Sequence, residues 1–203
     1  VGKAQILNAE LVTSDGYVVT ASFETPWFLQ QGNYYDVEVR SKEGTDGAFL
    51  VSKTPPQGTS SSAAWFSDNI FGISGRYGAY GAPQDVRVLR DERDRSVDGG
   101  RLLEYSFTAL KGNAEVQRRA FVKAVSPPGS KDVVILVAGT TASRWKKENG
   151  EKTSRAVVDS LRVSSTKTNL KKDEASDYRT YKSKMPDLAP QKNGGGAMYN
   201  NGD

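Results

Sequence analysis

The chain contains no cysteine and no histidine among its 203 residues, and this absence removes most of the side chains that carry protein chemistry. Thiolate nucleophiles, thiolate zinc sites and imidazole bases each need one of these two residue types. Catalysis would have to depend on carboxylates, lysine, tyrosine or serine alone. We therefore expect a protein that is not an enzyme and that binds no cofactor directly. A small enzyme or carrier with a pocket is the alternative.

Carboxylates concentrate in one charged segment of the sequence: Asp91, Glu92, Asp94 and Asp98. Calcium takes several hard oxygen ligands, so this segment could form a weak calcium site. The same segment also contains arginines that would neutralise the carboxylates: Arg90, Arg93, Arg95 and Arg101. A solvated turn held by surface ion pairs is therefore the favoured interpretation, and we predict no metal ligand here.

Basic residues gather toward the end of the chain. One group surrounds the last predicted helix: Lys146, Lys147, Lys152, Arg155 and Arg162. A second group continues beyond it: Lys167, Lys171 and Lys172. These side chains could contact acidic loops of a partner, or they could form an ordinary solvated helix face. Docking contacts of this kind would weaken in salt, because exposed charges are screened within a Debye length.

The net charge of +4 and a pI of about 9.2 favour an anionic partner, either an acidic protein surface or lipid headgroups. The excess is too small, and too evenly mixed with acidic residues, to indicate nucleic acid. The aromatic residues are also not interleaved with Arg and Lys as in a base-stacking surface. No run of about 18 apolar residues is present, so no transmembrane helix is predicted.

The elements that must position these residues are mostly strands. Alternating or continuous apolar residues predict strands over these ranges: 17–24, 34–40, 48–53, 85–94, 101–109, 116–125 and 132–139. Turn residues between the last four predict an antiparallel meander. A helix is predicted over 63–73, with its N-cap in 60–62. Residues 1–14 form an edge strand, a short helix or an arm on a partner.

The segment from Asp132 to Val163 is the clearest strand–helix–strand unit. Its helix follows Arg144-Trp145, is interrupted at Asn149-Gly150, and leads to a short strand over 161–163. Trp145 is predicted to anchor the core or its rim, because an indole buries a large area. Trp27 and Trp65 receive the same interpretation.

Beyond this unit, residues 166–203 read as an extended tail with few apolar residues and many charges. Such a segment cannot bury enough apolar area to order itself, so we expect a large partner to hold it. The predicted contact points on the tail are its aromatic and larger apolar residues: Tyr178, Tyr181, Met185, Leu188, Met198 and Tyr199.

The order of these elements resembles the PsbP family, the lumenal extrinsic proteins of oxygenic photosystems. The resemblance covers about Asp15 to Ser164, and rests on features taken together in order: a strand from Gly16-Tyr17 to Trp27, a helix leading to a Gly/Tyr-rich loop over 60–81, the Gly99-Gly100 turn, and Arg144-Trp145 followed by Asp159-Ser160-Leu161. Some members bind metal through His with carboxylates. That property does not carry over, because this chain has no His.

The resemblance implies an α+β protein with an α/β/α sandwich around a central antiparallel sheet, the Mog1/PsbP-like fold. It divides the chain into an arm (1–14), a PsbP-like domain (15–165) and the tail (166–203). It implies a non-catalytic extrinsic subunit, peripheral on the lumenal side of the chloroplast thylakoid membrane, that contacts membrane and extrinsic subunits of a photosystem. Photosystem II is the first choice, where such subunits stabilise the oxygen-evolving complex and help retain calcium and chloride.

Two further expectations accompany this one. The alternative function is a PsbP-like assembly factor, or a subunit of another thylakoid complex such as photosystem I, since the tail extends past the end of the family pattern. The chain begins with Val1 rather than Met, as expected of a mature protein whose targeting peptide has been removed, or of a trimmed chain.

Overall fold

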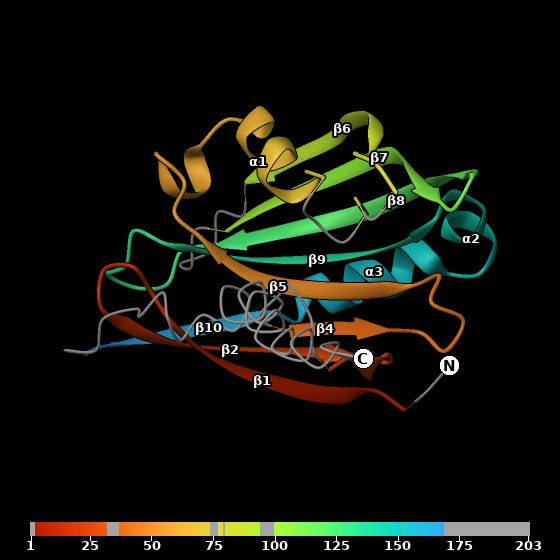
Figure 1. The fold of residues 1–203 in the computed structure, drawn as a ribbon. Coiled ribbons are helices and arrows are strands. Elements are labelled where there is room, and N and C mark those ends of the chain that lie inside the picture. The colour runs from red at the N-terminus through yellow and green to blue at the C-terminus, as the bar shows by residue number, and fades with distance from the viewer. Residues whose placement is uncertain (1–2, 32–36, 74–76, 79, 94–99, 169–203) are drawn as a thin grey trace, which may run out of the picture. The chain divides into compact units, whose positions relative to one another are not determined.

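A computed structural model of the chain describes residues 3–31, 37–73, 77–78, 80–93 and 100–168. Residues 1–171 form one compact unit, and residues 172–203 form a second unit that lies outside the described residues. The described part of the first unit is dominated by β-strands, with three short α-helices packed on them (Figure 1).

The larger of two sheets has seven strands, and all of its neighbouring strands are antiparallel. Its strand order is β3-β4-β5-β9-β8-β7-β6. Its strands have these bounds: β3 Phe28–Leu29, β4 Val37–Arg40, β5 Gly47–Lys53, β6 Gln84–Arg93, β7 Arg101–Lys111, β8 Ala114–Val125 and β9 Val133–Thr141. The predicted meander is therefore confirmed as β6 to β9.

The smaller sheet joins the two ends of the unit. It has the order β1-β2-β10, formed by β1 Gln5–Val12, β2 Tyr17–Thr25 and β10 Arg162–Lys167. The first segment of the chain is thus an edge strand, the first of the three alternatives for residues 1–14. β10 is longer than the predicted strand over 161–163, because it pairs along β2 from Arg162↔Ser22 to Lys167↔Tyr17.

Helices cover both faces of the seven-stranded sheet. After a short 3-10 turn, η1 Gly58–Ser60, helix α1 Ala63–Ile70 covers one face. Helices α2 Ala142–Lys147 and α3 Gly150–Asp159 lie on the other face. Asn149 separates α2 from α3 with a left-handed backbone (φ 56°), which explains why the predicted helix is interrupted there.

Helix α1 begins as predicted but ends early. The Ser62 hydroxyl accepts a hydrogen bond from the Trp65 amide at 3.1 Å, which confirms the predicted N-cap. The helix ends at Ile70, and Phe71, not Ile73, turns into the core. The predicted helix end at Ile73 is therefore wrong, and Ile73 is 68% exposed.

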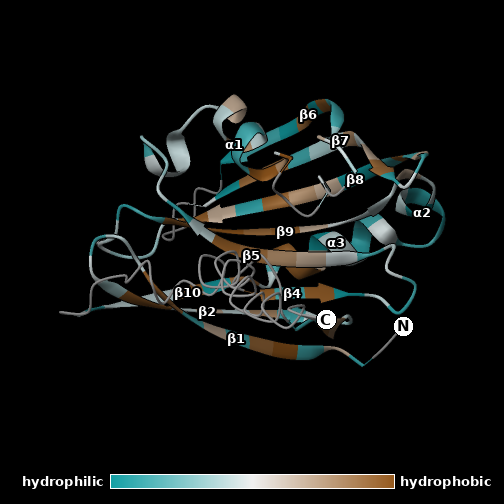
Figure 2. Cartoon of the chain, viewed as in Figure 1, coloured by the Kyte–Doolittle hydropathy of each residue, from teal (hydrophilic) through white to brown (hydrophobic). Residues whose placement is uncertain are grey.

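The core has one cluster on each face of the seven-stranded sheet. β9 is buried on both faces and supplies residues to both clusters, with Leu136 facing α2, α3 and β2, and Ile135 facing α1. Figure 2 shows the corresponding brown bands along β9 and its neighbours. The expected α+β class with antiparallel sheets is confirmed.

The three tryptophans differ in burial. Trp145 and Trp27 are 2% and 5% exposed, so both anchor the core as predicted. Trp65 is only partly buried and lies edge-on to Phe66, with ring centroids 5.2 Å apart. It therefore lies on α1 at the rim of the core.

Strand β6 forms one edge of the large sheet, and it is irregular. Its pairing with β7 shifts register twice, between Gln84 and Arg87 and between Val88 and Arg90. Nearly all of its side chains are exposed, and even the apolar Val88 is 38% exposed. The strand contacts the core only weakly, through the partly buried Val86.

Two aspartates hold the β1–β2 turn against the large sheet. The buried Asp132 carboxylate accepts hydrogen bonds from the Ser14 amide (2.9 Å), the Ser14 hydroxyl (2.6 Å) and the Thr54 hydroxyl (2.8 Å). Asp15 accepts from the Lys131 amide at 2.7 Å. Desolvation raises the pKa of Asp15, but its hydrogen bonds outweigh this and hold that pKa below its usual 3.8.

Tyr105 on β7 gives a prediction for alkaline pH. It is fully buried beneath α1, and desolvation raises its pKa from 10.0 to about 12. The folded state disfavours the phenolate, so stability present below pH 10 is lost as the pH rises through 12. Between pH 9 and pH 12, we expect the Tyr105→Phe variant to lose roughly 1–3 kcal/mol less of its free energy of unfolding than the wild type loses. Urea unfolding of both proteins across this range measures it, and identical pH dependences would contradict it.

Candidate functional site

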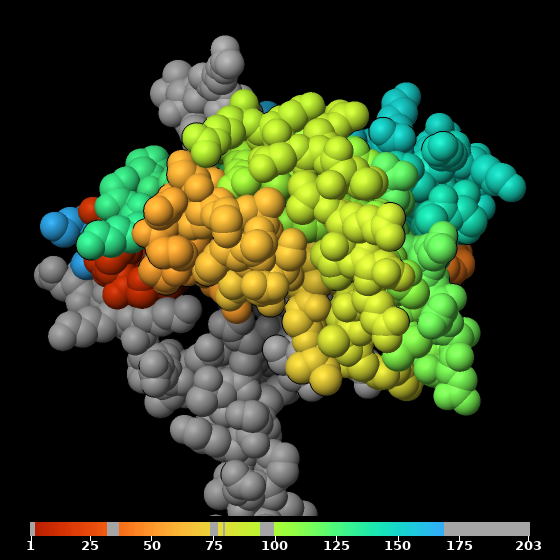
Figure 3. Space-filling model, turned by 90° about the horizontal axis from the view of Figure 1, so that it is seen from above, coloured from red at the N-terminus to blue at the C-terminus, as the bar shows by residue number. Residues whose placement is uncertain are grey.

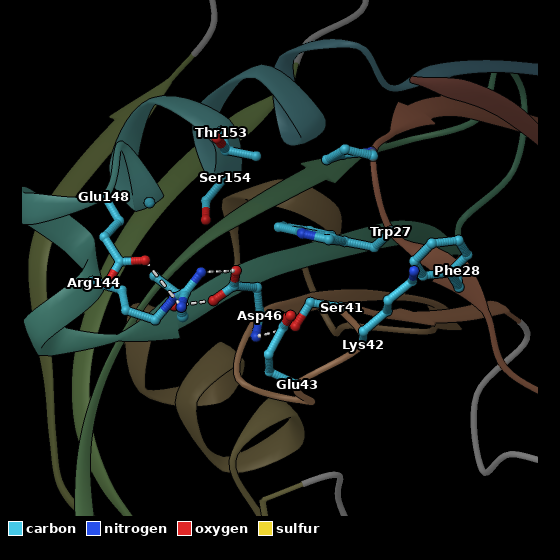
Figure 4. Close-up of a pocket in the computed structure, with 13 residues that line it drawn as sticks. Trp27, Phe28, Ser41, Lys42, Glu43, Asp46, Arg144, Glu148, Thr153 and Ser154 are labelled. Atoms are coloured by element: carbon cyan, nitrogen blue, oxygen red, sulfur yellow. Dashed lines mark hydrogen bonds and ion pairs between the residues drawn. The ribbon is translucent and has the colours of Figure 1, made fainter. Parts of the chain in front are cut away.

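A cavity of about 400 Å³ lies where α2 and α3 meet the turn between β4 and β5 (Figure 4). We call it the α3 cavity. Three distant parts of the chain line it: Pro26, Trp27 and Phe28; Ser41, Lys42, Glu43 and Asp46; and Thr140, Arg144, Glu148, Gly150, Thr153 and Ser154. The antiparallel pairing of β5 with β9 brings the second and third parts together, because it sets Gly47 opposite Gly139.

A network of ion pairs and hydrogen bonds forms one wall of the α3 cavity. One guanidinium nitrogen of Arg144 lies 3.1 Å from the Asp46 carboxylate and another lies 3.0 Å from the Glu148 carboxylate. The Thr140 hydroxyl donates to the other Asp46 oxygen, and the Asp46 amide donates to the Ser41 hydroxyl at 3.2 Å. Arg144 is thus held between two carboxylates, which fixes α2 against the β4–β5 turn.

Aromatic side chains form the opposite wall. Figure 4 shows Trp27 across the cavity from Arg144, with Phe28 beside it. Trp27 is nearly buried, whereas Phe28 is 46% exposed at the cavity mouth. The Lys42 ammonium lies 5.6 Å from the centroid of the Phe28 ring, within cation–π distance.

Two polar atoms on the cavity wall are buried and make no hydrogen bond to any described residue: Ser154 Oγ and Arg144 Nε. Ser154 is fully buried, and Figure 4 shows its hydroxyl directed into the cavity. It shares the inner face of α3 with the buried Val157 and Val158. An unpaired buried hydroxyl destabilises the fold by roughly 1–3 kcal/mol, so it calls for an explanation.

The start of α3 shapes the floor of the cavity. A Cβ on Gly150 would lie 2.6 Å from Thr140 Cγ2 and 2.8 Å from the Arg144 carbonyl oxygen, so no larger residue fits without a shift. Glycine at this position therefore allows α3 to start close to β9 and α2. This close approach places Ser154, one turn later, at the cavity wall.

The arrangement is suited to binding. An activated serine needs a base within hydrogen-bond reach, and Ser154 Oγ has no such partner among the described residues. Three carboxylates and two cations line the cavity, so its net charge is negative by one unit. Neutral and apolar groups are therefore favoured over anions.

The predicted basic group lies next to the cavity on the outer surface of α2 and α3. Lys146, Lys147 and Lys152 are exposed and form no ion pair with any residue that the structure describes. In Figure 3 the teal segment of α2 and α3 projects at the edge of the molecule. Arg155 differs, because it pairs with Asp159 at 2.7 Å and lies 5.6 Å from the centroid of the Phe121 ring.

The predicted tail contacts lie outside the described residues: Lys171, Lys172, Tyr178, Tyr181, Met185, Leu188, Met198 and Tyr199. Lys167, which the sequence groups with them, is exposed at the end of β10.

The carboxylate segment forms ion pairs along β6 and β7. Asp91 lies 2.7 Å from the buried Arg101, and Arg90 lies 3.8 Å from Glu92. The hydrogen bonds from Arg101 lower the pKa of Asp91. Desolvation raises that pKa, but by less. Among the described residues no group of three or more acidic side chains is placed to hold a metal ion, while Asp94 and Asp98 lie outside them. The favoured interpretation of a salt-bridged segment is confirmed for Asp91.

Comparisons with known proteins add little. No family model and no curated protein matches the chain. Among solved structures, the chain is similar to the crystal structure of LpqN, involved in cell envelope biogenesis of Mycobacterium tuberculosis, with 11% sequence identity and a TM-score of 0.43. That match covers 78% of this chain and 91% of that chain, and a likeness this weak supports no inference. None of the helices in the described part of the chain is long and apolar enough to cross a membrane.

Proposed function

We propose that the chain is a non-catalytic extrinsic subunit of a photosystem, in the first place photosystem II, on the lumenal side of the thylakoid membrane. It docks through the outer surface of α2 and α3, and it stabilises the oxygen-evolving complex by slowing the loss of calcium and chloride. The proposed fold is PsbP-like. Helices on both faces of an antiparallel sheet and the buried Trp145 after Arg144 support this fold.

One observation carries the docking proposal. Lys146, Lys147 and Lys152 present positive charge that no described acidic side chain neutralises. Unpaired surface charge attracts an acidic partner over several ångströms and speeds encounter, whereas a paired charge such as that of Arg155 contributes less. On α2 and α3, these three lysines are therefore the members of the predicted basic group that form no ion pair with a described residue.

Charge reversal of the three lysines tests the proposal. We expect the triple variant Lys146→Glu, Lys147→Glu and Lys152→Glu to rebind salt-washed thylakoid membranes at least tenfold more weakly than the wild type, because attraction becomes repulsion. Co-sedimentation at increasing ionic strength measures rebinding, and the wild-type protein should be released as salt rises.

A matched control separates docking from net charge. The triple variant Lys3→Glu, Lys111→Glu and Lys131→Glu changes the charge equally at exposed positions outside α2 and α3. We expect it to rebind nearly as the wild type does. Equal loss in both variants would contradict the assigned docking face, and a wild-type protein that never co-purifies with a photosystem would refute the function itself.

Stoichiometry separates a stable subunit from the alternative assembly factor. A subunit is expected at about one copy per mature complex, and an assembly factor well below that. Quantitative mass spectrometry of purified photosystem II and photosystem I also identifies the host complex.

A further inference from the structure

We propose that the α3 cavity binds a small neutral molecule that has a flat apolar body and a carbonyl oxygen. The carbonyl oxygen accepts hydrogen bonds from the Ser154 hydroxyl and from Arg144 Nε, and the flat body lies against Trp27 and Phe28. This inference does not rest on the proposed photosystem function, because it uses only the residues of the cavity.

The unpaired donors determine the need for an acceptor. Ser154 is fully buried with its hydroxyl directed into the cavity, and it has no partner among the described residues. Arg144 also lines the cavity, and its Nε is a second buried atom without a partner among the described residues. A guanidinium nitrogen can only donate. A ligand oxygen that accepts from these donors removes the cost of leaving them buried and unsatisfied.

The charges of the lining determine that the ligand is neutral. Arg144 is already shared between Asp46 and Glu148, so it has little attraction left for a further anion. With three carboxylates against two cations, the cavity repels a carboxylate ligand. A cationic ligand is attracted by the carboxylates, but its ammonium group has no lone pair to offer to the donors of Ser154 and Arg144.

The shape and the apolar wall determine the body of the ligand. The volume of about 400 Å³ lies in the range of pockets that hold small molecules, roughly 300–1,000 Å³. Trp27 and Phe28 offer an aromatic surface opposite the polar wall. A ring packs on such a surface in an offset or edge-on arrangement while its substituent points across to Ser154.

Three probes of nearly equal shape test the proposal: benzamide, benzoate and benzylammonium. We expect benzamide to bind with a Kd on the order of millimolar, as suits so few atoms, and the two charged probes to bind at least about tenfold more weakly. Binding is measured by ¹H–¹⁵N chemical-shift changes of Thr153, Ser154 and the Trp27 indole. Equal binding of all three probes, no binding of benzamide, or shifts that map away from the cavity would each overturn the proposal.

A single substitution tests the role of the hydroxyl. Ser154→Ala removes the unpaired group with little change of volume, so we expect benzamide to bind about fivefold more weakly while the Tm stays equal or rises. Ser164→Ala, the same change at an exposed position on β10, is the matched control and should leave binding unchanged. Wild-type affinity in Ser154→Ala would refute the proposed contact.

Discussion

Replacing Trp145 with alanine is expected to lower the free energy of unfolding by about 3–5 kcal/mol, the range found when a buried indole is deleted. Trp145 is 2% exposed, and its ring centroid lies 5.0 Å from that of Phe121. The Arg119 guanidinium lies 5.3 Å from the indole centroid, so the ring also carries a cation–π contact. Urea unfolding monitored by circular dichroism measures the loss.

Two further variants define the cause of this loss. The Trp145 indole nitrogen is buried and has no hydrogen-bond partner among the described residues. Trp145→Phe keeps most of the packing and removes that unpaired N–H, so it should cost clearly less than the alanine variant. Trp65→Ala, at the partly exposed rim of the core, should also cost less. A loss below about 1 kcal/mol in Trp145→Ala would contradict the anchoring role.

Asp132→Ala is expected to cost about 3 kcal/mol or more, because it leaves several donors without their carboxylate. The buried Asp132 accepts from the Ser14 amide, the Ser14 hydroxyl and the Thr54 hydroxyl, and so links the small sheet to the large one. Hydrogen exchange should rise most at the β1–β2 turn, since this turn loses its hydrogen bonds to Asp132 and keeps those of Asp15. Mass spectrometry of exchange at residues 13–16, together with urea unfolding, measures both effects.

Asp15→Ala is the matched control for Asp132→Ala. Asp15 lies on the same turn and accepts from the Lys131 amide and the Ser130 hydroxyl, but it is exposed. Water can satisfy the donors that Asp15 leaves, so we expect a loss of about 1 kcal/mol or less. Equal losses of stability in the two variants would contradict the claim that burial strengthens the hydrogen bonds of Asp132.

Local patterns predicted the strands well and the helix end less well. The strands at 101–109, 116–125 and 132–139 differ from β7, β8 and β9 by two residues or fewer at each end. Glycine-containing turns bound them, and their apolar residues alternate or, in β9, run continuously. The end of α1 depended instead on whether Phe71 or Ile73 entered the core, and only tertiary packing decides that. The pairing of β10 with β2 joins residues about 140 apart, and no local pattern specifies it.

The α3 cavity was missed for the same reason. Asp46 lies in what the sequence shows as a simple turn, and Arg144 and Ser154 become its neighbours only once β5 pairs with β9. One signal was available in the sequence. Ser154 shares a helical face with Val157 and Val158, and a lone hydroxyl on an apolar face is a reason to look for its partner. The docking lysines were visible from composition, but which of them lacked a partner was not.

The irregular edge strand β6 affects how readily copies of the chain associate at high concentration. An exposed edge of a sheet offers unpaired amide and carbonyl groups to another molecule, and this is a common route to aggregation. The register shifts of β6 interrupt that row, and charged side chains line it: Arg87, Arg90, Asp91, Glu92 and Arg93. Edge-to-edge association of two copies is thereby disfavoured, so a crowded compartment can hold this chain without fibre growth from β6.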